Sequence, residues 1–265
     1  MTQRRIALIQ RSGTYVGPAL ARRLARSGHD IVAHCPSPGL ADQLATLGAT
    51  VEVIGEDEVP LDGPGSDLTA SGTQRLVDRS LARFGRLDAA ALAPQRPAHL
   101  GPSRGLMLDA SSDRAAAMSV YLEATFHALR AVIPAMRATK GQILVFTSDV
   151  AARPEAGWSL YGAARAGQNH FVRAVALEHA HEGICINALG SKNAVFDGFP
   201  SCPPGAATDD AVSLGEWSDQ LVAETPLGRL GTMEELAAFA AVLLDGSNRF
   251  QTAQYFSFSG GWDAG

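Results

Sequence analysis

Short, wholly apolar runs alternate with longer amphipathic stretches from one end of the chain to the other. The apolar runs predict strands, because each is short and rich in aliphatic residues. They lie at Ile6–Gln10, Ile31–His34, Val51–Ile54, Leu87–Ala93, Ile143–Thr147, Ile184–Leu189 and Gln254–Phe258. The amphipathic stretches predict helices at 16–28, 39–48, 70–84, 112–139, 159–181 and 233–245. Strands that are apolar throughout belong in a parallel sheet covered on both faces.

Repeated strand–helix units predict an α/β fold, a doubly wound, Rossmann-like parallel sheet of about seven strands. No linker or change of composition divides the chain, so we expect a single domain over residues 1–265. Two irregular segments, about 94–111 and 190–215, are rich in Gly, Pro and Ser. Loops of this length are often functional, and we expect 190–215 to be an active-site loop or lid.

Composition narrows the classes of partner. A net charge of −5 argues weakly against nucleic acid or an anionic membrane as partner. No apolar run approaches the ~20 residues that span a bilayer, and the first residues lead directly into a strand. The three cysteines, Cys35, Cys185 and Cys202, are widely spaced, as expected for reduced thiols. These features favour a cytoplasmic protein without a metal site.

Three residues form the main candidate for catalysis. Ser148 follows an apolar run, Tyr161 comes thirteen residues later and Arg165 four residues after that. Residues four apart share a helix face, and a guanidinium beside a phenol stabilises the phenolate, so the tyrosine is a candidate general base. Ser148 at a strand end is placed to hold a substrate oxygen. The structural alternative is a partly buried tyrosine beside a solvated arginine. The presence of Ser148 at this spacing counts against that alternative.

The first strand–helix turn is an incomplete nucleotide-binding signature. A dinucleotide site needs glycines here so that the backbone can approach a pyrophosphate. Gly13 and Gly17 are present, but Tyr15 stands between them and Arg11 sits at the strand end. The turn is either an ordinary connection or one in which Tyr15 fills the space of a cofactor. The following HCPSPG segment offers no acidic residue for a ribose and no basic residue for a 2′-phosphate. Asp67 could hold an adenine ring, as in a related fold, but as a lone aspartate we expect it to be a surface or helix-capping residue.

The chain resembles the short-chain dehydrogenase/reductase superfamily along nearly its whole length. The Ser148–Tyr161 spacing, the PLGRLGTMEELA segment (226–237) and the terminal FSFSGGW carry this resemblance. Reductases of the superfamily have lysine four residues after the tyrosine. Arg165 in that place, together with Tyr15, resembles the halohydrin dehalogenases, in which a halide pocket replaces the nicotinamide pocket.

The chain also departs from these patterns. Tyr121 stands where reductases place an asparagine on the central helix, and ALAPQ replaces the asparagine motif after the fourth strand. Dehalogenases usually carry an asparagine–tyrosine pair after the sixth strand, where this chain reads GSKNAVF. Lys192 in that segment either strengthens an anion site or faces solvent.

The resemblance implies a halohydrin dehalogenase that closes vicinal haloalcohols to epoxides, releases halide, and in reverse opens epoxides with azide, cyanide or nitrite. It implies that Ser148 binds the substrate oxygen, Tyr161 is the base and Arg165 tunes it, with no redox cofactor and no metal. It also implies a homotetramer. The implied halide pocket comprises Tyr15, Leu189, Gly190, Ser191, Lys192, Asn193 and Phe196. The alternatives are an NAD(P)-dependent oxidoreductase with arginine in place of lysine, and a non-catalytic member of the superfamily.

Overall fold

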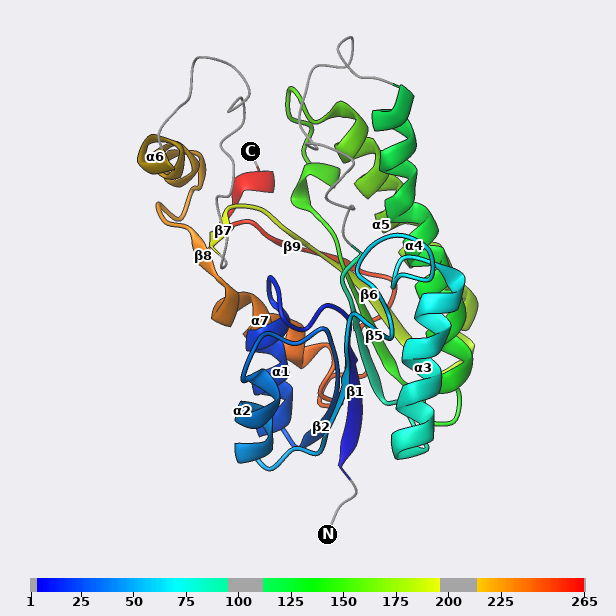
Figure 1. Cartoon of the computed structure of the whole chain (residues 1–265). Helices are drawn as coiled ribbons and strands as arrows, with labels where there is room; N and C mark the ends of the chain where they lie inside the picture. The colour runs from blue at the N-terminus through cyan, green and yellow to red at the C-terminus, as the bar shows by residue number, and fades with distance from the viewer. Residues whose placement is uncertain (1–3, 95–111, 196–213, 265) are drawn as a thin grey trace.

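A seven-stranded sheet forms the centre of the molecule (Figure 1). The computed structural model describes residues 4–94, 112–195 and 214–264. The sheet comprises β1 (Arg5–Ile9), β2 (His29–His34), β3 (Val51–Ile54), β4 (Ala89–Leu92), β5 (Gln142–Phe146), β6 (Cys185–Ser191) and β9 (Tyr255–Phe258). All neighbours pair in parallel, in the order β3-β2-β1-β4-β5-β6-β9. The predicted fold class is confirmed, and each predicted strand end lies within two residues of the observed one.

Helices cover both faces of the sheet (Figure 1). On one side lie α1 (Gly17–Arg26), α2 (Leu40–Thr46) and α7 (Met233–Val242); on the other lie α3 (Ala70–Phe84), α4 (Ser112–Met136) and α5 (Ser159–His179). The pattern of hydrophobic residues also predicted these helices. It missed α6 (Leu214–Glu224) and the two-residue strands β7 (Ala194–Val195) and β8 (Gly231–Thr232). None of the described helices is long and apolar enough to cross a bilayer.

Strand β1 shows why the strands are apolar throughout. Ala7 and Ile9 belong to the buried cluster under α1 and α7, whereas Ile6 and Leu8 belong to the cluster under α3, α4 and α5. Successive side chains of a strand point to opposite faces, so a sheet covered on both faces needs apolar residues at every position.

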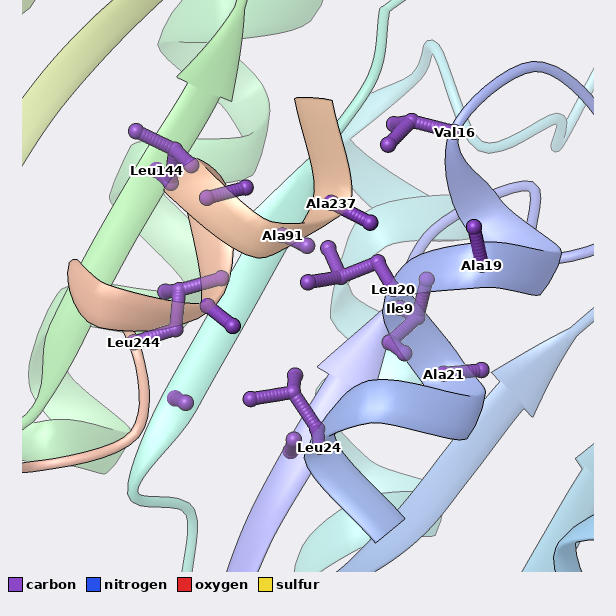
Figure 2. Packing of buried hydrophobic residues seen from close by; sticks show 14 of the residues in the cluster. Ile9, Val16, Ala19, Leu20, Ala21, Leu24, Ala91, Leu144, Ala237 and Leu244 are labelled. Atoms are coloured by element: carbon purple, nitrogen blue, oxygen red, sulfur yellow. The ribbon is translucent and has the colours of Figure 1, made fainter. Parts of the chain in front are cut away.

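Figure 2 shows the first of these clusters, in which Leu20 and Leu24 of α1 lie over the sheet near Ala91 and Ile9. Both leucines are fully buried. Truncation of such a leucine to alanine typically costs about 2–5 kcal/mol, so this face anchors α1 and the turn before it.

The strand order fixes the position of a ligand site. The chain leaves β1 towards β2 on one side, whereas β4 lies on the other side of β1. In open parallel sheets, ligands bind beyond the carboxyl ends of the strands at such a switch point. The turn after β1 and the residue after β5, Thr147, both lie at this edge.

Candidate active site

Ser148 and Tyr161 come from neighbouring elements at the carboxyl edge of the sheet. Ser148 is the N-cap of the short helix η3 (Asp149–Ala151), where its hydroxyl accepts a hydrogen bond from the amide of Val150 at 3.4 Å. Tyr161 lies in the first turn of α5, which packs closely on η3: a Cβ on Gly162 would lie 3.1 Å from the Val150 carbonyl oxygen. The structure therefore places the predicted serine and tyrosine on two segments in contact.

Aromatic rings surround Tyr161. Tyr121 of α4 meets its ring edge to face, with centroids 5.5 Å apart, and the Trp158 ring lies 5.4 Å away. Tyr161 is half-buried. The surrounding rings restrict its rotation, so its hydroxyl has a defined position at the carboxyl edge of the sheet.

Arg165 is buried beneath these rings. Its guanidinium lies 3.8 Å from the centroid of the Tyr121 ring and 5.3 Å from that of Tyr161, and Nη1 donates a hydrogen bond of 2.8 Å to Gln168. Only 7% of the residue is exposed, so the solvated-cation alternative is wrong. Arg165 stabilises the aromatic cluster through cation–π contact and thereby positions Tyr161; tuning of the phenol by Arg165 stays a prediction.

A buried carboxyl group, that of Asp149, follows Ser148 directly in the chain and was not among the predicted site residues. Asp149 is fully buried, and the hydroxyl of Tyr255 on β9 donates a hydrogen bond to it. Burial raises the pKa of Asp149 to about 6, although the bond from Tyr255 partly offsets this effect. Burial also raises the pKa of the Tyr255 phenol. The only sequence signal was an aspartate beside the candidate serine.

Two predicted pocket residues directly after β6, Lys192 and Asn193, bind other parts of the protein through their polar groups. Lys192 Nζ pairs with Glu155 and lies 4.5 Å from the Trp262 ring. Asn193 donates a 3.0 Å hydrogen bond to Thr225. Lys192 is thus neither solvated nor an open anion site.

The other predicted pocket residues are packed inside the protein or lie outside the described residues. Leu189 is core, and Gly190 packs against Ser148, since a Cβ there would lie 3.0 Å from the Ser148 carbonyl carbon. Ser191 shares a hydrogen bond with Tyr15. Phe196 lies outside the described residues, as does most of the expected 190–215 lid.

Asp67 is a buried ion-pair partner, so its expected surface position is wrong. Its carboxylate accepts hydrogen bonds of 2.8 and 2.7 Å from Nε and Nη2 of Arg11, and Gln10 adds a third at 2.8 Å. Asp67 is fully buried, and 7% of Arg11 is exposed. The two residues are 56 positions apart, so neither local pattern indicated the pair.

Comparison with known proteins decides the family. Residues 13–263 match a family model described as enoyl-(acyl carrier protein) reductase. The chain belongs to the short-chain dehydrogenase/reductase superfamily. It is 30% identical to subunit BbsC of a hydroxy(phenyl)methylsuccinyl-CoA dehydrogenase from Thauera aromatica, over 98% of this chain and 95% of the relative. It is 27% identical to acetoacetyl-CoA reductase of Cupriavidus necator over the full length of both.

The solved structure of levodione reductase supports the same fold, with a TM-score of 0.81, 22% identity and 98% coverage of both chains. The two chains thus share their overall fold. At this identity the likeness concerns the fold alone.

The expected dehalogenase activity is wrong. Relatives that span the whole chain are named dehydrogenases and reductases, and they favour the oxidoreductase alternative over carbon–halide lyase chemistry. Arg165 and Tyr15 had suggested the dehalogenase branch, but both side chains have internal roles: Arg165 holds the aromatic cluster and Tyr15 binds Ser191. The halide pocket was implied only by that activity and therefore loses its basis.

The superfamily implies a nicotinamide dinucleotide at the switch point, and in this structure two large side chains obstruct the turn that would bind it. Arg11 and Tyr15 occupy the turn after β1, where a pyrophosphate would need an open backbone. The carboxylate of Asp67 is already held by Arg11 and Gln10. We therefore derive no catalytic step through a nicotinamide.

Proposed function

We propose that the chain is a short-chain oxidoreductase acting on a hydroxyl or carbonyl group of an acyl-CoA thioester. The observation that carries this proposal is the whole-length relationship to proteins named as a succinyl-CoA-type dehydrogenase subunit and an acetoacetyl-CoA reductase. Ser148 and Tyr161, at the carboxyl edge of the sheet, supply groups suited to a substrate that changes between alcohol and ketone.

The proposed roles follow from the chemistry of the two hydroxyl groups. Ser148 donates a hydrogen bond to the substrate oxygen and holds it beside Tyr161. Tyr161 transfers a proton to that oxygen in reduction and removes it in oxidation, which is general acid–base catalysis worth about 10²–10⁴-fold in rate. Arg165 acts as a positioning residue, because it contacts the Tyr121 and Tyr161 rings.

A nicotinamide, when bound, supplies the hydride for this class of reaction. The closed turn at Arg11 and Tyr15 favours a second candidate function, namely a subunit that binds the same class of substrate without turnover. The printed name of one relative, a dehydrogenase subunit, also supports this second candidate.

Turnover measurements separate the two candidates. Acetoacetyl-CoA and other 3-oxoacyl thioesters are offered with millimolar NADH or NADPH, and the corresponding free ketones serve as the matched control. The oxidoreductase proposal expects nucleotide oxidation that depends on the thioester. Binding of the thioester without turnover supports the non-catalytic subunit, and turnover of free ketones alone contradicts the substrate class.

We propose in addition a cytoplasmic homotetramer. Large apolar side chains remain exposed on α4 and α5, including Leu122, Phe126 and Leu177, and the exposed fraction of Leu177 is 69%. Such exposed apolar groups are typical of an interface. Light scattering after chromatography tests this, since Leu177→Glu is expected to dissociate the assembly, and an unchanged mass would contradict the use of α5 as an interface.

A further inference from the structure

The turn after β1 contains two side chains at positions that favour glycine. Arg11 and Tyr15 both have left-handed backbone, with φ of 55° and 51°. Residues other than glycine rarely adopt this conformation, and bulky ones do so at an energetic cost. Gly17 allows α1 to approach the turn closely, because a Cβ at this position would lie only 2.7 Å from the Ser12 carbonyl oxygen. The turn thus carries two large side chains at positions whose backbone favours glycine.

Arg11 ties the turn after β1 to Asp67. Its guanidinium binds both carboxylate oxygens of Asp67, and Nη2 also donates 2.6 Å to the Leu61 carbonyl. A bidentate guanidinium–carboxylate pair is strong and geometrically specific. An anion that binds Arg11 would have to break this pair, whose members are 56 positions apart in the chain.

The backbone fills the space next to Arg11. A Cβ on Gly13 would lie 2.5 Å from the carbonyl oxygen of Cys35 and 2.5 Å from the amide nitrogen of Ser37. The turn after β1 therefore touches the segment after β2. A nucleotide ribose held between these two segments needs them to separate.

Tyr15 links the turn after β1 to β5 and β6. Its hydroxyl shares a hydrogen bond with Ser191 at the end of β6, and its ring meets Phe146 of β5 edge to face, with centroids 6.0 Å apart. Burial raises the pKa of the Tyr15 phenol, so the group is neutral. The side chain thus reaches from the turn after β1 to the ends of β5 and β6, over the edge where a bound ligand would lie.

We propose that Arg11 and Tyr15 form an internal closure of the dinucleotide site and lower its affinity for NADH and NADPH. Arg11 binds the Asp67 carboxylate, so this carboxylate is not free to bind a nucleotide. Tyr15 blocks access from the turn after β1 to Ser148 and Tyr161. The inference concerns the cofactor site of the proposed oxidoreductase and in that respect rests on it. Removal of both side chains takes these two obstacles away from the turn after β1.

The test measures binding without turnover. Isothermal titration of NADH and NADPH compares the wild type with Arg11→Gly, Tyr15→Gly and the double variant. Glycine suits the left-handed backbone at both positions. We expect the double variant to bind at least about tenfold more tightly than the wild type, equivalent to about 1.4 kcal/mol, with the single variants between them.

Two control variants isolate the cause. Tyr15→Phe keeps the ring and is expected to gain no affinity. Arg22→Ala removes a positive charge from α1 without touching Asp67, and it is also expected to leave nucleotide affinity unchanged. If Arg11→Gly fails to fold because Asp67 is left unpaired, the variant Arg11→Gly/Asp67→Asn removes both charges and takes its place.

The outcomes decide between closure and an open site. A folded double variant whose affinity for NADH and NADPH equals that of the wild type would overturn the proposal. A double variant that binds nucleotide tightly but turns over no acyl-CoA thioester supports the closure and contradicts the proposed activity. The two proposals therefore fail separately.

Discussion

Replacement of Asp149 by asparagine is expected to stabilise the protein at neutral pH. Asp149 is fully buried behind Ser148, and burial raises its pKa to about 6 from an ordinary value of 3.8. The neutral carboxyl is therefore favoured by the folded state, and ionisation in the folded protein has a cost. Asparagine keeps an oxygen to accept the hydrogen bond from Tyr255 and carries no charge.

The sign and size of the effect follow from linkage between protonation and folding. A folded-state pKa above the unfolded one gives stability that is fully present below pH 3.8 and is lost as pH rises through about 6. The gap of about 2 pH units, at 1.36 kcal/mol for each, amounts to about 3 kcal/mol. Above pH 6 the variant avoids this loss, whereas at pH 4 the two proteins differ little on this account.

Urea unfolding of the wild type and Asp149→Asn at intervals from pH 4 to pH 8 checks the prediction. The difference in free energy of unfolding is expected to grow by about 3 kcal/mol across this range in favour of the variant. Asp219→Asn, which removes an exposed carboxylate from α6, is the control and is expected to show a flat difference. A difference that stays constant with pH, or that grows in favour of the wild type, would refute the reasoning.

Three further predictions concern local structure. Thr232→Ala removes the capping box of α7 and is expected to lower the free energy of unfolding by about 1 kcal/mol; an unchanged urea midpoint would contradict the cap. Gly17→Ala is expected to destabilise by about 1–3 kcal/mol through its clash with Ser12, whereas Gly167→Ala, with no atom within 4 Å, is expected to stabilise by about 0.5–1 kcal/mol; thermal unfolding that shows equal effects would count against this account. Burial raises the pKa of Cys35 to about 11, so site-resolved mass spectrometry is expected to show alkylation at pH 8 about 100-fold slower than for a free thiol; equal rates would exclude a buried thiol.

The strands and most helices could be predicted from the sequence because their signal is local. The run ILVF within β5 is apolar at every position and lies between two layers of helices. The short strands β7 and β8 have two residues each and are defined by their mutual pairing, which no window of sequence displays. Helix α6 follows a segment rich in Gly, Pro and Ser, and its amphipathic pattern is short.

The candidate site was only partly predictable. Ser148 and Tyr161 stand out because their residue types and spacing are unusual for a structural role. The pairs Arg11–Asp67 and Lys192–Glu155 join residues far apart in the sequence. The residues next to them in the chain therefore led to wrong predictions of what these side chains contact. Arg165 illustrates the limit of residue type alone: its position suggested a different chemistry, whereas its contacts assign it to an aromatic cluster.

The measurement that tests the central claim most directly compares wild type and Tyr161→Phe in nucleotide-dependent turnover of acetoacetyl-CoA. Both proteins are assayed at millimolar NADH and NADPH over pH 6–9. We predict measurable turnover by the wild type and a loss of at least about 100-fold in kcat for Tyr161→Phe with little change in KM, because the proton donor is lost while the substrate contacts remain. Turnover by Tyr161→Phe within a few-fold of the wild type would contradict the role of Tyr161, and no nucleotide-dependent turnover by the folded wild type would contradict the proposed oxidoreductase.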